Sequence, residues 1–145
     1  MQDSDATALL TIYGDPLVMQ YTDEAPFPDL ATVNLMLNSV HKLLAVGASL
    51  EWAIILREQD ELIGTCGLHS FHDGGAEVGC LLKQTAWGHG HMAQAITLLA
   101  DYARDHLQLN YLIADVAAAN ERANRLFRKL GHVHNESALW RCDLS

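Results

Sequence analysis

Residues 85–95 read TAWGHGHMAQA, and this stretch joins two segments of different character. Before it, the apolar run AEVGCLL at residues 76–82 is typical of a β-strand, and after it apolar residues recur at helical spacing as far as residue 107. The first N–H groups of a helix have no internal partners, and the helix dipole is positive at that end. Because Gly88 and Gly90 let such groups approach an anion closely, the stretch predicts a pyrophosphate-binding turn.

The two glycines have three other interpretations: one remains open, and two are disfavoured by specific residues. A helix entry that binds no ligand fits the turn as well as an anion site does. A P-loop requires Lys and then Ser or Thr after its second glycine, where His91 and Met92 stand instead. A dinucleotide fingerprint matches GHGHMA in form but should follow its strand directly, and KQTAW intervenes here. Protonated histidines would add positive charge to an anion site. That site would comprise Gly88, His89, Gly90, His91, Met92 and Ala93.

The rest of the chain predicts one α/β domain, residues 1–145, built around a single sheet. Residues 50–82 indicate an antiparallel meander, because the apolar runs there are separated by the turn signals QDE and HDGG. Later strands are expected at 110–118, 133–137 and 138–144. Helices are expected at 5–16, 28–47, 91–107 and 120–131.

Capping residues define the ends of two of these helices. Asp29 and Asn120 are expected to cap their N-termini, and Gly47 and Gly131 to end them. Apolar spacing predicts which residues face inward. On the first of these helices they are Leu30, Val33, Leu37, Val40 and Leu44. On the second they are Ala123, Leu126, Phe127 and Leu130.

The composition argues against several classes of protein. A net charge of −9 disfavours nucleic acid as a partner, because phosphate binding requires a basic surface. No apolar run reaches the roughly 18 residues that a membrane span needs, and MQDSDATALL lacks the basic region of a signal peptide. The three cysteines fit reduced core thiols in a cytoplasmic protein.

Charge is distributed unevenly along the chain. No Lys or Arg precedes Lys42, whereas four of the nine basic residues lie between Arg122 and Lys129. Ordinary solubility together with one basic helix face explains this split. A sharper interpretation is that the molecule has one pole for a cation and another for an anion.

Two long motifs resemble the Gcn5-related N-acetyltransferases (GNAT), and within them the branch similar to the ribosomal-protein alanine acetyltransferases. In that family a strand with E-(I/V)-G leads into W-G-x-G-(Y/H)-(M/A)-x-(E/Q)-A, and here EVGC at 77–80 leads into WGHGHMAQA at 87–95. The family then has N-E-x-A-x-R-L-(Y/F)-x-K-L-G-F, and here NERANRLFRKLGH stands at 120–132. GDPLVM at 14–19 is similar to a third family segment, so the resemblance covers about residues 5–145.

The resemblance implies an acetyl-CoA site between two strands that splay apart, within a mixed and mostly antiparallel sheet flanked by helices. It implies that the turn, which begins at Trp87, holds the pyrophosphate. Asn120 would contact the pantetheine arm from the far side, and Arg125 or Lys129 would lie near the phosphates. The residues implied to pair with the arm are Cys80, Leu81 and Leu82.

Three positions depart from the family pattern. The first family strand is missing ahead of the first helix, because MQDS is too short to form it, and a bare sheet edge favours a homodimer. Phe127 stands where many relatives have a tyrosine that acts as general acid. His132 replaces the usual aromatic residue, which we expect to be neutral for function. The first two departures keep open an alternative: a non-catalytic CoA-binding relative that serves as a sensor or interaction module.

The implied reaction is transfer of acetyl from acetyl-CoA to a primary amine, by direct attack in a ternary complex. The amine must lose a proton, which a carboxylate or a histidine can accept. Glu77, at the start of the third meander strand, is the first candidate for this general base, His69 on the neighbouring strand is the second, and Asp115 is the weakest. Each has the alternative of being an ordinary solvated strand residue.

The acceptor is expected to be a small-molecule or peptide amine that carries positive charge. In the family the first two helices line the acceptor groove, and here that part of the chain contains no Lys or Arg. A peptide N-terminus, a polyamine or an aminosugar would suit such a groove. No metal is expected, because the pairs His69 with His72 and His89 with His91 lack a thiolate or carboxylate at ligand spacing.

Overall fold

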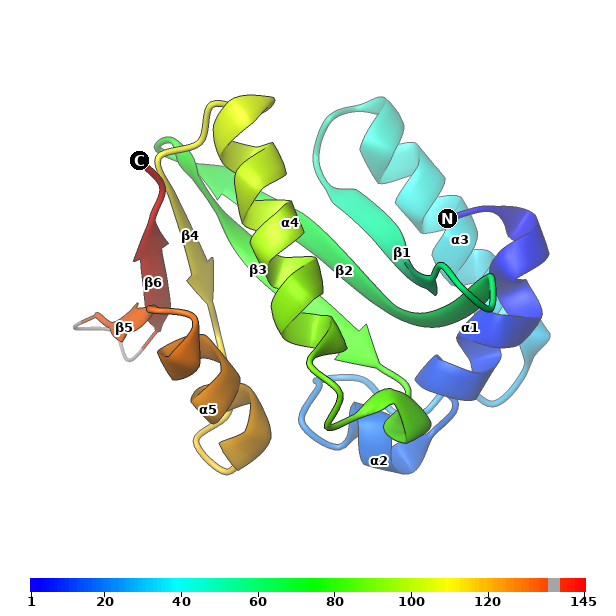
Figure 1. The fold of residues 1–145 in the computed structure, drawn as a ribbon. Helices are drawn as coiled ribbons and strands as arrows, with labels where there is room; N and C mark the ends of the chain where they lie inside the picture. Colours follow the sequence, from blue (N-terminus) through cyan, green and yellow to red (C-terminus); the bar gives the residue numbers. More distant parts are fainter. Residues whose placement is uncertain (136–138) are drawn as a thin grey trace.

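The computed structural model describes residues 1–135 and 139–145, and its framework is a six-stranded sheet in the order β1-β2-β3-β4-β6-β5 (Figure 1). Only β3 and β4 pair in parallel, and the other neighbours are antiparallel. The predicted mixed, mostly antiparallel sheet is therefore confirmed. The strands are β1 (Leu50–Leu56), β2 (Glu61–His72), β3 (Gly75–Leu82), β4 (Tyr111–Ala114), β5 (Val133–His134) and β6 (Trp140–Asp143).

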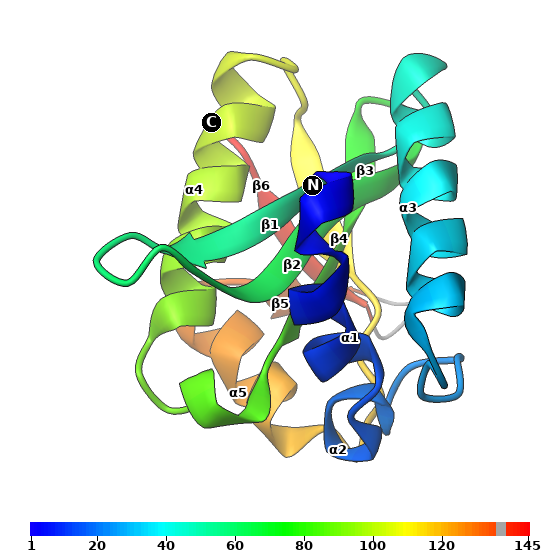
Figure 2. The ribbon, with the colours of Figure 1, turned by 90° about the vertical axis from the view of Figure 1, so that its right-hand side faces the viewer.

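Helices cover both faces of this sheet. α4 lies on one face and α3 on the opposite face (Figure 2), and α1 packs against α3 and β2. α5 lies on the same side as α4, beside β4 and β6 (Figure 1). The helices are α1 (Ala6–Tyr13), α2 (Pro16–Met19), α3 (Leu30–Ala45), α4 (His91–Asp105) and α5 (Glu121–Lys129), with 3-10 turns η1 (Asp3–Asp5) and η2 (Gln84–Ala86).

The predicted caps are confirmed, and one short helix was missed. The Asp29 carboxylate accepts a hydrogen bond from the Thr32 N–H at 2.9 Å, and Asn120 Oδ1 accepts one from the Ala123 N–H at 3.2 Å. The sequence predicted one helix at 5–16, but α1 ends at Tyr13 and the Asp15 carboxylate caps a second helix, α2, whose first residue is a proline. A four-residue helix is too short for apolar spacing to reveal it.

The predicted inward face of α5 is confirmed, and that of α3 is correct only in the middle of the helix. Only Val33 and Leu37 of α3 are buried, whereas Leu30 and Leu44 are 43% and 52% exposed. The reason is that α3 packs on α1 and the edge strand β1, so only its middle is covered. On α5, Phe127 is buried, Leu126 and Leu130 are partly buried and pack against the same cluster, and Ala123 is partly buried.

Strand lengths also differ from prediction. The strand expected at 110–118 ends at Ala114, so residues 115–119 form a loop that leads into α5. Within the expected strand 138–144, β6 spans Trp140–Asp143. Within the expected strand 133–137, β5 spans only Val133–His134, and residues 136 and 137 lie outside the described residues. The apolar pattern of residues 110–118 could not show where the pairing of β4 with β3 ends.

The core forms on both sides of the sheet. On the α1–α3 side it contains Leu9, Ile12, Val33 and Leu37, and on the α4 side Leu68 packs with residues of α4 and β4. The three cysteines are free thiols, as expected. Among the described residues, no helix combines the length and apolar character needed to cross a membrane.

Candidate functional site

The pairing of β3 with β4 ends partway along the sheet, and we call this break in the pairing between the two strands the cleft. Their parallel pairing covers only three residue pairs and ends at Glu77 and Ile113. Beyond that point β3 continues to Leu82, still paired with β2 on its other side, while β4 stops at Ala114 (Figure 1). The edge of β3 from Val78 onward therefore offers main-chain N–H and C=O groups to a ligand rather than to a strand.

The glycine turn lies at the end of this open edge. Gly88 and Gly90 have φ of +81° and +78°, and a Cβ placed on either would meet no atom within 4 Å. The first main-chain bond of α4 runs from the Gln94 N–H to the Gly90 C=O at 3.2 Å, and Gly90 supplies no side-chain cap. The N–H groups of His91–Ala93 consequently lack intrahelical acceptors, as an anion site requires.

Trp87 anchors the turn to the core. Its Nε1–H donates to the Leu82 C=O at 2.8 Å, which ties the turn to the end of β3. Its ring packs against two buried clusters, one of which includes Ile63 and Ala86. The turn is thus held in place by contacts that do not use its free N–H groups.

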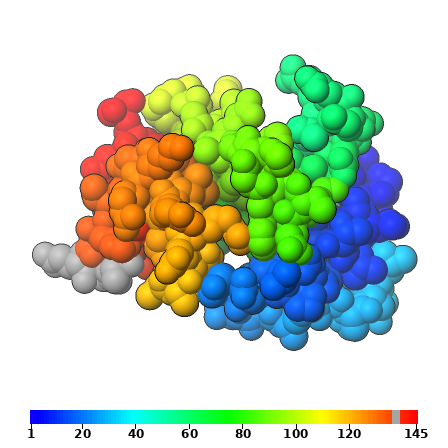
Figure 3. All heavy atoms as spheres, turned by 60° about the horizontal axis from the view of Figure 1, so that its bottom comes forward, coloured from blue at the N-terminus to red at the C-terminus, as the bar shows by residue number. Residues whose placement is uncertain are grey.

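The loop into α5 forms the other wall of the cleft. Asn124, which the sequence did not single out, organises this loop: Nδ2 donates to the Ala117 and Asn120 C=O groups, and Oδ1 accepts from Trp140 Nε1 at 2.8 Å. Figure 3 shows a small opening at this end, between atoms of α2, of the turn before α4 and of the loop into α5.

The basic residues of α5 point in two directions. Arg125 lines a hollow of about 730 Å³ on one side of α5, together with Asp115 and Arg128. Arg122, which was not predicted, lies against the turn instead, its guanidinium 3.4 Å from the centroid of the Trp87 ring. Lys129 is exposed in the last turn of α5. Of these three basic residues of α5, Arg122 is therefore the one that contacts the glycine turn.

The two candidate bases share one face of the sheet. His69 and Glu77 are cross-strand partners, and so are Gly67 and Gly79, two residues along. Directly opposite residues point to the same side, and so do residues two apart on one strand. Thr65 is on this side too and bonds Tyr13 of α1 at 3.2 Å, so this is the face that α1 covers.

His69 leans toward the open edge of β3. Its Nε2 lies 3.6 Å from the place a Cβ would take on Gly79, and its Nδ1 is 3.0 Å from Ser70 Oγ. Gly79 belongs to the part of β3 that has lost β4 as a neighbour. The imidazole is thereby placed beside the part of the β3 main chain that has no strand neighbour on its β4 side.

Glu51 is a third acid on this face, and the sequence analysis missed it. It is the cross-strand partner of Gly67, and its carboxylate occupies the space that a Cβ on Gly67 would need. Burial raises the pKa of Glu51 to about 7, against a smaller opposing effect of the N-terminal amine. The sequence signal that could have identified Glu51 is a charged residue within the apolar strand LEWAIIL, on the same face as Ala53.

The remaining candidates are not brought together. Asp115 is exposed at the end of β4, in the hollow beside α5. His72 pairs with Asp73 at 2.9 Å in the exposed β2–β3 turn, and the rings of His89 and His91 are 5.8 Å apart. In the part of the chain that the structure describes, no three His, Cys, Asp or Glu side chains cluster closely enough to hold a metal ion.

Comparison with known proteins agrees with this arrangement. The model of the acetyltransferase (GNAT) domain family matches residues 1–133. The uncharacterized N-acetyltransferase p20 of Bacillus licheniformis is 33% identical over 132 residues, which are 90% of this chain and 74% of that protein. A spermidine N-acetyltransferase of Vibrio cholerae, solved with CoA and spermine, superposes with a TM-score of 0.86 at 19% identity, covering 99% of this chain and 92% of that one.

A second Vibrio cholerae structure has the same fold. It is provisionally named a ribosomal-protein-serine acetyltransferase, and it superposes with a TM-score of 0.81 at 12% identity over 99% of this chain and 90% of that one. At such identities the two structures show a shared fold and leave the acceptor open.

Proposed function

The chain belongs to the GNAT family of acetyltransferases and acts as an N-acetyltransferase, and from this we propose that it transfers acetyl from acetyl-CoA to a primary amine by direct attack. The observation that carries the proposal is the separation of β3 from β4 beyond Glu77, beside a glycine turn with free N–H groups. Acetyl-CoA supplies the activated thioester. The residues of the chain bind it, orient it and accept a proton.

We assign residues of the cleft to two polar parts of acetyl-CoA, the pyrophosphate and the pantetheine arm. The N–H groups of His91–Ala93 would bind the pyrophosphate, with room left by Gly88 and Gly90. The main chain of Cys80–Leu82 would pair with the amides of the pantetheine arm, much as an added strand does. Asn120 uses Oδ1 to cap α5, and the described residues give its Nδ2 no acceptor, so Nδ2 would donate to the arm.

The acceptor amine would be deprotonated on the face that α1 covers. As its nitrogen bonds to the carbonyl carbon and the C–S bond breaks, the amine gives up a proton and the sulfur gains one. We assign the proton acceptor to His69 or Glu77, with the position of His69 over Gly79 as support. Glu51 joins them as a candidate because a pKa of about 7 suits a base that works near neutral pH.

The sulfur receives its proton from water in this proposal. Phe127, at the position of the tyrosine acid in many relatives, is only 2% exposed and packs edge-on against His132. Its side chain has no proton to donate. The absence of this hydroxyl limits how fast the leaving group departs but does not prevent the transfer.

We propose a cationic acceptor. The support is the acidic character of the face that would receive it, where Glu51 and Glu77 flank two glycines, and the lack of basic residues ahead of Lys42. The Vibrio cholerae relative in fold was solved with spermine, a polycation. Membership of the branch similar to the ribosomal-protein acetyltransferases, which would make a peptide N-terminus the acceptor, and a homodimer through the free edge of β1 both stay predictions.

Calorimetric titration with acetyl-CoA tests the cofactor site. We expect saturable binding by the wild type and its loss in Gly90→Tyr, because a large side chain at φ +78° strains the turn and fills the cradle. Absence of binding by the wild type would contradict the proposal.

Turnover distinguishes the enzyme from a non-catalytic sensor. Thiol release from acetyl-CoA would be followed with spermidine, an N-terminal peptide and an aminosugar as acceptors. Acceleration by any of these amines, reduced in His69→Ala or Glu77→Gln, supports the transferase. Tight acetyl-CoA binding with no acceleration by any amine would favour the sensor.

A further inference from the structure

Arg122 crosses the open end of the cleft. It belongs to α5, on the β4 side, and its guanidinium lies 3.4 Å from the centroid of the Trp87 ring, on the β3 side. The two sides share no sheet pairing here, since the β3–β4 ladder ends at Glu77 and Ile113. Side-chain contact therefore holds a positive charge beside the glycine turn.

The N–H donors of Arg122 are available to a ligand. Within residues 1–135 and 139–145, Arg122 makes no ion pair and no hydrogen bond. A guanidinium on an aromatic ring uses its face, and its five N–H groups lie in its plane and stay free for a planar or anionic partner.

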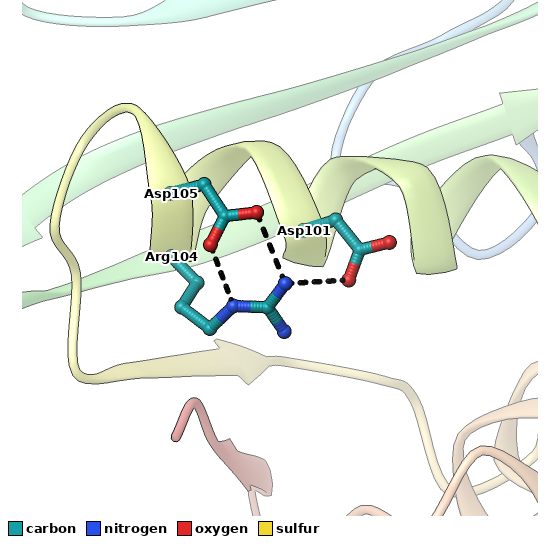
Figure 4. A network of polar contacts seen from close by, with 3 residues as sticks. All are labelled: Asp101, Arg104 and Asp105. Atoms are coloured by element: carbon teal, nitrogen blue, oxygen red, sulfur yellow. Dashed lines mark hydrogen bonds and ion pairs between the residues drawn. The ribbon is translucent and has the colours of Figure 1, made fainter.

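Other basic residues near α4 are already engaged. Lys83, which precedes the turn, forms an ion pair with Glu61. Arg104, near the other end of α4, is held between Asp101 and Asp105, with its Nε 2.8 Å from Asp105 Oδ1 (Figure 4). Among the described Lys and Arg residues, the contrast leaves Arg122 as the side chain that both contacts the turn and has uncommitted donors.

We propose that Arg122 recognises the pyrophosphate of CoA at the glycine turn, and that Trp87 holds its guanidinium in position beforehand. This rests on the proposed function, since it takes CoA as the ligand of the cleft. Trp87 is suited to the role because its own N–H is bound to the Leu82 C=O at 2.8 Å, so the ring is fixed before the ligand arrives. A positioned guanidinium loses less rotational freedom on binding, and Arg binds phosphate oxygens in pairs.

Calorimetric titration with CoA tests this role in wild type, Arg122→Gln and Arg128→Gln. Arg128 is the matched control, because it lies on the same helix and also faces a tryptophan, Trp140, with its guanidinium 5.6 Å from the ring. Loss of a hydrogen-bonded charge typically costs a factor of about 10 to 100 in affinity. We expect that loss in Arg122→Gln, an intermediate loss in Arg122→Lys, and less than a twofold change in Arg128→Gln.

A second ligand shows which phosphate Arg122 meets. 3′-Dephospho-CoA keeps the pyrophosphate and lacks the remaining phosphate, so Arg122→Gln should weaken its binding by the same factor as that of CoA. A penalty that disappears with 3′-dephospho-CoA would overturn the pyrophosphate assignment. Equal effects of Arg122→Gln and Arg128→Gln on CoA would overturn the inference altogether, while wild type that binds no CoA would contradict the proposed function itself. Thermal unfolding of each variant would check that folding is unchanged.

Discussion

His132 follows Gly131 at the end of α5, and the structure buries it until only 5% of its surface is exposed. Neither ring nitrogen has a hydrogen-bond partner among the described residues, and the ring packs edge-on against Phe127 at 5.1 Å. Burial lowers the pKa of His132, because the charged imidazolium would lose its hydration there. The His132 side chain therefore fills a site suited to an apolar aromatic ring, but it buries two polar nitrogens there without hydrogen bonds.

We predict that His132→Phe stabilises the protein. Two unsatisfied nitrogens are removed, which should raise the free energy of unfolding by about 1 kcal/mol at pH 7.5. The gain should grow at pH 5. Because the pKa of His132 is lowered in the folded state, the unfolded chain binds a proton there that the folded chain does not bind. The stability of the wild type therefore falls as the pH drops below the pKa of the unfolded chain. Urea unfolding at both pH values measures this. His72→Gln, at an exposed site, is the control, and a variant less stable than wild type at both pH values would refute the prediction.

Glu51 has the opposite pH dependence. Its pKa is raised from 4.5 to about 7 in the folded protein, chiefly by burial, so the folded state holds a proton that the unfolded chain releases. Its contribution to stability is complete below about pH 4.5 and is lost as the pH rises through 7.

We predict that Glu51→Gln raises the free energy of unfolding by about 1–3 kcal/mol at pH 8 and by much less at pH 4.5. The amide fills the same space over Gly67 without a charge to bury. Urea unfolding across this range gives the measurement, with the exposed Glu58→Gln as control. An equal effect at both pH values would mean that ionisation of Glu51 is not what destabilises the fold.

At the scale of elements, the turn between β3 and α4 shows how a local conformation and a binding site are combined. Gly88 and Gly90 both have left-handed backbones with open space around them. The glycines are required for their φ angles, since a Cβ would meet no neighbour. A glycine that also has a left-handed backbone but lies far from the proposed ligand site can therefore separate the effect of a substitution on stability from its effect on ligand binding.

Gly47, at the end of α3, is that glycine, with φ of +70° and equally open surroundings. We predict that Gly90→Ala and Gly47→Ala each destabilise the protein by about 1 kcal/mol, the usual cost of a left-handed alanine. Only Gly90→Ala should also weaken CoA binding, because its methyl group lies at the proposed pyrophosphate site. Thermal unfolding and calorimetry measure the two effects, and a similar loss of CoA affinity in Gly47→Ala would count against a local role for the turn.

At the scale of the whole molecule, the sheet consists of two parts that are joined by three parallel residue pairs between β3 and β4. Beyond them the parts connect through side chains such as Arg122 and Trp87. A ligand that fills the cleft would replace missing main-chain partners on the β3 side.

Hydrogen exchange should reveal this replacement. We predict that CoA slows amide exchange in two separate segments, the open part of β3 at 78–82 and the first turn of α4 at 91–93, because both have main-chain groups without sheet or helix partners there. Exchange in α3, on the far face, should be unchanged. Mass spectrometry after deuterium labelling measures the effect. Protection confined to α3 and α1 would place the ligand elsewhere.

Several features followed from the sequence alone because they depend on neighbours in the chain. HDGG determined the β2–β3 turn, Asp29 and Asn120 determined two helix starts, and the glycines before α4 determined a left-handed turn. Each is a matter of backbone dihedral angles or of a bond between residues three apart, so a single segment carries the information.

The tertiary structure alone decided where distant segments meet. It ended β4 at Ala114 and so opened the cleft, it covered α3 only at Val33 and Leu37, and it brought Glu51 beside Gly67. It also turned Arg122 of α5 toward Trp87, whereas Arg125 faces a different hollow. Several arginines lie on α5, and the relative orientation of two packed elements decides which of them reaches a turn some 30 residues earlier in the chain. Spacing along the chain does not determine that orientation.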